Sequence, residues 1–227
     1  GGGVSAYLRA AMAVYLKDVR SEARTRESVA LVLVFAILAA FIFNFAFDPN
    51  PRVLAAVGPG IVWVAYLFAG MLGLSRGFAQ EKERGTLDGL LLAPVGRDAL
   101  YAGKMLSTLT LLLTVEALML PVFAALYDLP VLDARFVGLA ALATVGYAAA
   151  GTLFSAIAAH TRAREALLPL LFLPAVLPLV IGAVAGTAAI FDGEGWSEYG
   201  RWIQLIAVYD VLLIGVSSLT FEYVLED

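Results

Sequence analysis

The chain has 227 residues, of which 61% are hydrophobic and 15% charged, and its mean hydropathy is +0.88. This balance excludes an ordinary soluble globular domain and predicts a membrane protein. The formal net charge of -4 and an isoelectric point near 5.0 argue against nucleic acid as a partner, because nucleic-acid binding needs a basic surface.

Residues 1–28 carry a pattern that predicts a helix lying in the headgroup layer of a membrane. With Ser5 in position to cap that helix, apolar side chains fall on one face and basic side chains on another. The apolar set is Tyr7, Leu8, Ala11, Met12, Tyr15, Leu16 and Val19, and the basic set is Arg9, Lys17, Arg20 and Arg24. A secretory signal peptide fits less well, because the segment is too long and too charged. We expect two parts, an amphipathic interfacial helix over 1–28 and a single membrane domain over 29–227.

Six apolar runs follow, each long enough to cross a bilayer. A helix rises about 1.5 Å per residue, so roughly 20 residues cross a hydrocarbon core of about 30 Å. The runs are Val29 to Phe47, Val53 to Ser75, Tyr101 to Tyr127, Ala134 to Ala159, Ala166 to Phe191 and Trp202 to Phe221, with an outer loop over 192–201. None alternates as a barrel strand does, and only helices and closed barrels satisfy the backbone in lipid. The sequence therefore predicts an all-α membrane protein with six transmembrane helices.

The distribution of Lys and Arg predicts the orientation of these helices. Twelve of the fifteen basic residues precede the first run or lie in and beside the second and fourth connections, while Arg52, Arg135 and Arg201 lie on the other side. Positive charge resists translocation, so both termini are expected in the cytoplasm.

Several kinds of site are excluded by what the sequence lacks. It has no cysteine and a single histidine, His160, so we expect no disulfide and no metal or haem site with the usual donors on the outer face. A Walker A phosphate loop around Lys104 would need Gly at Asp98 and Ser or Thr at Met105. We therefore expect no catalysis and no cofactor bound by this chain.

Three polar residues lie inside the apolar runs and are candidates for intramembrane function: Glu116, Asp210 and Asn44. An ionised side chain at the centre of a bilayer costs on the order of 3 kcal/mol on insertion scales. Glu116 is the sharpest case, because it lies near the middle of the third run. Such a group lines a proton or substrate path, or it joins helices by a hydrogen bond, and the sequence leaves both interpretations open. The first predicts an autonomous proton-coupled secondary transporter that uses Glu116.

The connection between the second and third runs carries a distinctive charged segment. We expect the second helix to continue as a polar extension, to end near Gly85, and to be followed by a short helix that Thr86 caps and Pro94 ends. Leu87, Leu90 and Leu91 form one apolar face of that short helix. Such a face fits a hydrophobic groove on a partner or lies on the membrane surface, and the pattern alone favours neither.

The order of these motifs resembles a known class of permeases. Glu81-x-Glu83-Arg84-Gly85-Thr86-Leu87, followed by Leu90-Leu91-x-x-Pro94, resembles the loop of ABC-2 type exporter permeases, in which a short coupling helix docks on a separate ATPase subunit. Further motifs are similar to the cytochrome c maturation protein B family of haem-exporter permeases, and the likeness covers nearly the whole chain. They are Gly58-Pro59-Gly60-Ile61-Val62-Trp63-Val64-Ala65, Lys104, Pro121, and the Leu-Pro pairs that end at Pro169, Pro174 and Pro178.

The resemblance implies a permease subunit of an ABC transporter in the bacterial inner membrane, present in two copies with two ATPase subunits. It implies that Glu81 to Pro94 couple the permease to the ATPase subunit, that ATP acts on that partner, and that haem is the candidate cargo. Further implied partners are a haem-handling membrane protein and a periplasmic haem chaperone, whose haem-loaded form ATP hydrolysis would help to release in cytochrome c biogenesis. A passive scaffold for these partners is a third hypothesis.

Overall fold

The structure is a computed structural model that describes residues 2–47, 51–83, 96–159, 161 and 164–224. These residues form seven helices and no strand, and six of the helices are long and apolar enough to cross a membrane. The helices are α1 (Gly2–Thr25), α2 (Glu27–Ala46), α3 (Pro51–Glu83), α5 (Arg97–Tyr127), α6 (Ala134–Ala159), α7 (Arg164–Phe191) and α8 (Trp196–Val224). The all-α class and the six predicted spans are thus confirmed.

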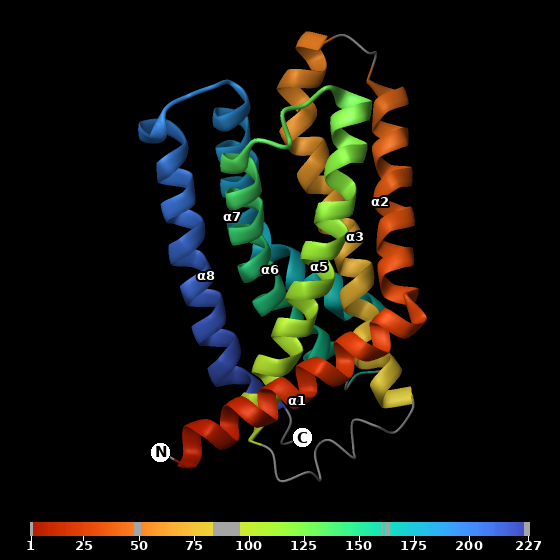
Figure 1. The fold of residues 1–227 in the computed structure, drawn as a ribbon, viewed down its shortest axis with the longest axis vertical. Helices are drawn as coiled ribbons and strands as arrows, with labels where there is room; N and C mark the ends of the chain where they lie inside the picture. The colour runs from red at the N-terminus through yellow and green to blue at the C-terminus, as the bar shows by residue number, and fades with distance from the viewer. Residues whose placement is uncertain (1, 48–50, 84–95, 160, 162–163, 225–227) are drawn as a thin grey trace.

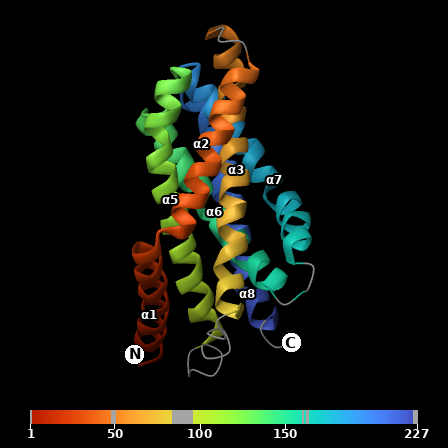
Figure 2. The same ribbon diagram turned by 90° about the vertical axis from the view of Figure 1, so that its right-hand side faces the viewer.

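The six long helices run along the long axis of the molecule, and α1 crosses one end of the bundle obliquely (Figure 1). We call this the α1 end; both termini lie there, because six spans bring the chain back to the side from which it starts. The opposite end carries residues 128–133 and 192–195, and we call it the far end. Figure 2 shows α1 beside the first half of α5, which is its main packing partner.

Helix α6 is the centre of the bundle, and it packs against α3, α5, α7 and α8. Small residues let the neighbouring helices approach closely, as the composition of this run suggests. A Cβ added to Gly151 would lie 2.6 Å from Leu74 Cδ1, and one added to Gly146 would lie 2.1 Å from Asp210 Oδ1. Gly138 differs, because a Cβ there would meet nothing within 4 Å. At these two glycines, α6 therefore comes close to α3 and to α8.

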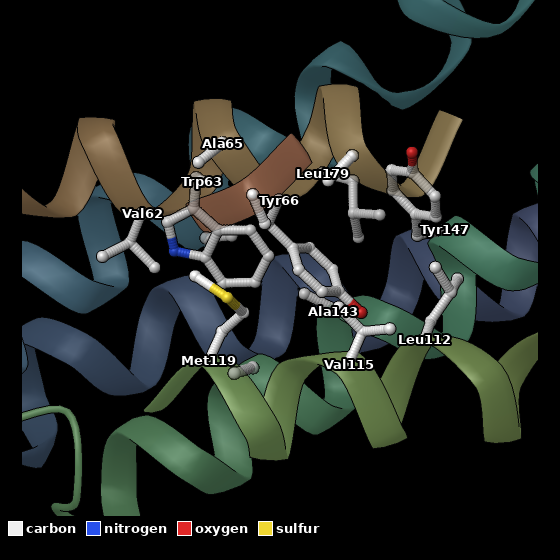
Figure 3. Close-up of a cluster of buried hydrophobic side chains, with 14 of the residues drawn as sticks. Val62, Trp63, Ala65, Tyr66, Leu112, Val115, Met119, Ala143, Tyr147 and Leu179 are labelled. Atoms are coloured by element: carbon white, nitrogen blue, oxygen red, sulfur yellow. The ribbon is translucent and has the colours of Figure 1, made fainter. Parts of the chain in front are cut away.

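Aromatic side chains of α3 fill the middle of the core (Figure 3). Trp63 and Tyr66 are both buried, with ring centroids 5.9 Å apart in an edge-on arrangement, and they face Val115 and Met119 of α5. The indole N–H of Trp63 donates to Thr187 Oγ1 of α7 at 2.9 Å. This hydrogen bond and the packing join α3 to two other helices.

Two helix ends differ from the prediction. Helix α8 begins at Trp196, so residues 196–201 are helical and do not belong to the expected loop over 192–201. The Gly195 carbonyl accepts the first N–H groups, from Glu198 and Tyr199, and the apolar run alone did not reveal these polar first turns. Helix α1 begins at Gly2, so Ser5 lies inside it and does not cap it.

Candidate functional site

Of the residues predicted to couple this chain to an ATPase, the structure describes the backbone of two, Glu81 and Glu83, at the end of α3. Helix α3 extends to Glu83, as the predicted polar extension requires, and the backbone of Glu81 and Glu83 belongs to its last turn. The other coupling residues, Arg84, Gly85, Thr86, Leu87, Leu90, Leu91 and Pro94, lie outside the described residues. Because α5 begins at Arg97, a force on residues 84–95 would reach α3 on one side and α5 on the other.

A buried ion pair fastens α1 to α5. Asp18 Oδ2 lies 2.9 Å from Lys104 Nζ and accepts a hydrogen bond from Ser107 Oγ at 3.3 Å. Only 7% of the Lys104 side chain is exposed, so its charge would be costly to bury without the carboxylate of Asp18. Lys17 Nζ lies 3.2 Å from the other oxygen of Asp18 and is much more exposed than Lys104.

The same two helices approach most closely at Gly103. A Cβ added there would lie 2.6 Å from the Ala11 carbonyl oxygen and 2.7 Å from Val14 Cβ, which is closer than such atoms pack. Ala11 and Val14 are both buried. Glycine at position 103 and the ion pair at Lys104 thus hold α1 against the beginning of α5.

The apolar face predicted for α1 is divided between two environments. Ala11 packs on α5, whereas Leu8, Met12 and Leu16 are exposed, together with Val4. These four side chains recur every four residues and therefore form one outward apolar stripe along the helix. The location of α1 in the headgroup layer stays a prediction, as does the division at residue 28, although α1 itself ends at Thr25.

Glu116 lies on α5, in the middle of the bundle, and its carboxylate is held by α6. Thr144 Oγ1 lies 3.0 Å from Glu116 Oε2 and 3.2 Å from the Tyr66 hydroxyl of α3. Thr144 Oγ1 also lies 2.8 Å from the carbonyl oxygen of Ala140, one turn earlier in α6. The hydroxyl of Thr144 has one proton, so it donates to one of these acceptors at a time. The contact joins three helices through polar atoms, which is the arrangement expected of a packing group.

Asp210 and Asn44 are not brought together with Glu116. Asp210 lies halfway along α8, where it is buried against Gly146 of α6. Thr144, two residues before Gly146, faces Glu116 from another side of α6. Asn44 lies in the last turn of α2, at the far end, and is half-buried. The three predicted intramembrane candidates are therefore separate sites.

The far end carries an ion pair and a group of aromatic rings. Arg135 Nη2 lies 2.7 Å from Asp133 Oδ2, and the backbone N–H of Arg135 donates to Asp133 Oδ1 at 2.8 Å. These hydrogen bonds hold the pKa of Asp133 below its ordinary value. The rings of Trp196 and Tyr199 meet edge-on at 5.3 Å, and the Arg135 guanidinium lies 5.9 Å from the Tyr199 ring.

The sequence did not reveal several residues that the structure makes important. Asp18 was not a candidate from the sequence. An acidic residue in a basic helix, together with a lysine just inside an apolar run, is nevertheless a pattern that indicates an ion pair. Thr144 and Thr187 are ordinary residues for an apolar run, and only their contacts, with Glu116 and with Trp63, give them a role.

Comparison with known proteins decides the family. The sequence model of the CcmB protein family matches residues 9–226. The chain belongs to the CcmB family. A relative named heme exporter protein B from Rhodobacter capsulatus is 32% identical over 176 residues, covering 75% of this chain and 79% of the relative. The relative of the same name from Paracoccus denitrificans is 32% identical and covers 76% of this chain and 80% of its own length. The one from Pseudomonas aeruginosa is 28% identical and covers 87% of this chain and 89% of its own length. CcmB membership confirms the resemblance that the Gly58 to Ala65 motif, Lys104, Pro121 and the Leu-Pro pairs indicated.

Proposed function

We propose that this chain is the permease subunit of an ATP-driven complex for cytochrome c biogenesis in the bacterial inner membrane. The observation that carries the proposal is the match to the CcmB family over nearly the whole chain, with relatives named heme exporter protein B. ATP is bound and hydrolysed by a separate ATPase subunit, and haem delivery, or release of a haem-loaded periplasmic chaperone, is the outcome. Two copies of the chain and a haem-handling membrane protein complete the complex.

The fold supports a mechanical role for residues 84–95. They connect α3 to α5, and α5 carries the Lys104 contact with Asp18 of α1. Helix α3 in turn is tied to α7 through Trp63 and Thr187. A displacement of residues 84–95 would therefore move α1, α3 and α5 together, and α7 would follow through the core.

The charge distribution supports placing the α1 end in the cytoplasm. Arg9, Lys17 and Lys104 lie at that end, whereas Arg135 and Arg201 lie at the far end beside Asp133 and Glu198. Basic residues are retained on the cytoplasmic side, so both termini and residues 84–95 face the compartment that holds ATP. The outward stripe of α1 at Leu8 and Met12 then lies at the depth of the headgroups.

The test is co-purification of the ATPase subunit from membranes that contain the tagged chain. Leu90→Asp places a charge in the predicted apolar face, and the double variant Glu81→Lys, Glu83→Lys reverses the charge beside it. Each is expected to abolish recovery of the ATPase while the chain still inserts. The matched control is Glu194→Lys at the far end, which is exposed and is expected to leave recovery unchanged.

The outcomes separate the three hypotheses. Unchanged recovery of the ATPase with Leu90→Asp and with the double variant would contradict the proposal. Normal cytochrome maturation with an ATPase partner that cannot hydrolyse ATP would favour the passive scaffold. Proton-coupled flux by the chain alone in vesicles, lost in Glu116→Gln, would favour the autonomous transporter.

A further inference from the structure

Among the described residues, Asp210 is the most deeply buried carboxyl to which the proposed function gives no role. Asp210 is 3% exposed, and it lies on α8 halfway between Trp196 and Val224. A Cβ added to Gly146 of α6 would lie 2.1 Å from Asp210 Oδ1 and 3.3 Å from Leu213 Cδ1. The carboxyl thus lies flat against the backbone of α6, in space that exists only because residue 146 is glycine.

Both carboxyl oxygens of Asp210 are buried, and neither makes a hydrogen bond of ordinary geometry with the residues that the structure describes, the nearest polar group being the backbone of Gly146. This separates Asp210 from Glu116, whose carboxylate oxygen lies 3.0 Å from the Thr144 hydroxyl. An ionised carboxylate in an apolar layer is costly unless it is paired or hydrogen-bonded, whereas a carboxylic acid is far less so.

The helices packed against α8 offer no positive charge at this depth. The sequence has no Lys, Arg or His over 105–127 of α5, 136–159 of α6, 166–191 of α7 or 202–224 of α8 itself. The titratable groups in the middle of these helices are Glu116 of α5, Tyr147 of α6 and Tyr209 of α8, and 166–191 of α7 has none. All three are engaged elsewhere, with Thr144, with the Leu67 carbonyl (2.6 Å) and with the Ala175 carbonyl (2.8 Å).

We propose that Asp210 is a proton-binding site between α6 and α8: its carboxyl carries a proton while Gly146 lies against it, and releases that proton when the two helices separate. Release leaves a carboxylate and one proton, and the charge then requires water or a cation between the helices. Protonation therefore favours the close arrangement of α6 and α8, and ionisation favours an open one. Any rearrangement that parts these helices would release a proton at this position, and their return to the close arrangement would take one up.

Infrared spectroscopy of the full chain in lipid vesicles tests the proposal. A protonated carboxyl gives a carbonyl stretching band that an ionised carboxylate lacks. At neutral pH the wild type is expected to show such a band, which is lost in Asp210→Asn and retained in Glu116→Gln. Retention of the whole band in Asp210→Asn, or its absence from the wild type, would overturn the proposal.

An isotope experiment keeps the test independent of whether Asp210→Asn folds. Asp210 is the only aspartate within the six apolar runs. Carbon-13 at the aspartate side-chain carboxyl of the wild type is expected to shift the band to lower frequency, because the heavier carbon vibrates more slowly. A band that does not shift belongs to a glutamate and would overturn the proposal. Neither experiment depends on an ATPase, so this inference can fail without the proposed function.

Discussion

The ammonium of Lys104 lies 2.9 Å from the carboxylate of Asp18, and this contact ties α1 to the helix that follows the predicted coupling segment. Lys104→Met removes the charge and leaves the partly buried Asp18 carboxylate without its nearest cation. Because the loss of one partner of a buried pair is costly, we expect a loss of about 2 kcal/mol in the free energy of unfolding. Thermal unfolding in detergent and protease cleavage within α1 measure it.

Lys17→Met is the matched control, because Lys17 contacts the same carboxylate at 3.2 Å from a more exposed position. It is expected to cost less than about 1 kcal/mol. Exchanging the charges, with Asp18→Lys and Lys104→Asp together, should recover part of the loss. Equal effects of Lys17→Met and Lys104→Met would show that the buried pair has no special role.

The close approach at Gly103 gives a second prediction about α1. Gly103→Ala places a methyl group 2.6 Å from the Ala11 carbonyl oxygen, so α1 must shift away from α5. We expect a loss of about 1–3 kcal/mol, as for other overpacked contacts, and weaker recovery of the ATPase on co-purification. Gly138→Ala is the control, because a Cβ there meets nothing within 4 Å. A tolerated Gly103→Ala with normal protection of α1 would contradict the observed packing.

Glu116 is predicted to act as a packing group. Glu116→Gln keeps an oxygen that can accept from Thr144, so we expect a loss below about 1 kcal/mol and normal cytochrome maturation. Thr144→Val has nearly the same shape but removes the donor, and it should cost more in thermal unfolding. Loss of cytochrome maturation in Glu116→Gln with unchanged stability would instead indicate a proton carrier.

The ion pair at the far end predicts a pH dependence with a definite sign. Hydrogen bonds from Arg135 lower the pKa of Asp133, so the pair contributes stability above the ordinary value of 3.8. That contribution is lost only as the pH falls through the lower pKa of the folded state. Carbon-13 NMR of the Asp133 carboxyl should give a midpoint below 3.8 in the wild type and a higher one in Arg135→Gln. Identical midpoints would exclude the pair in solution.

The sequence predicted the parts of the fold that depend on continuous apolar length. The run from Ala134 to Ala159 matches α6 at both ends, because its boundaries are set by polar loops. Prediction failed where a helix continues into polar sequence, as at the start of α8, since hydropathy does not detect exposed helical turns. It also missed the partners of Lys104 and Glu116, because such pairings depend on how separate helices pack.

We propose that an ATPase subunit binds residues 84–95, and this binding can be tested directly because the chain has no cysteine. Leu90→Cys can be cross-linked in native membranes with a short thiol-to-amine reagent, with Leu132→Cys at the exposed far end as the control. We expect a covalent product of Leu90→Cys with the ATPase subunit and none with Leu132→Cys. An ATPase that cross-links at position 132, or at neither position while it still co-purifies, would contradict the proposal.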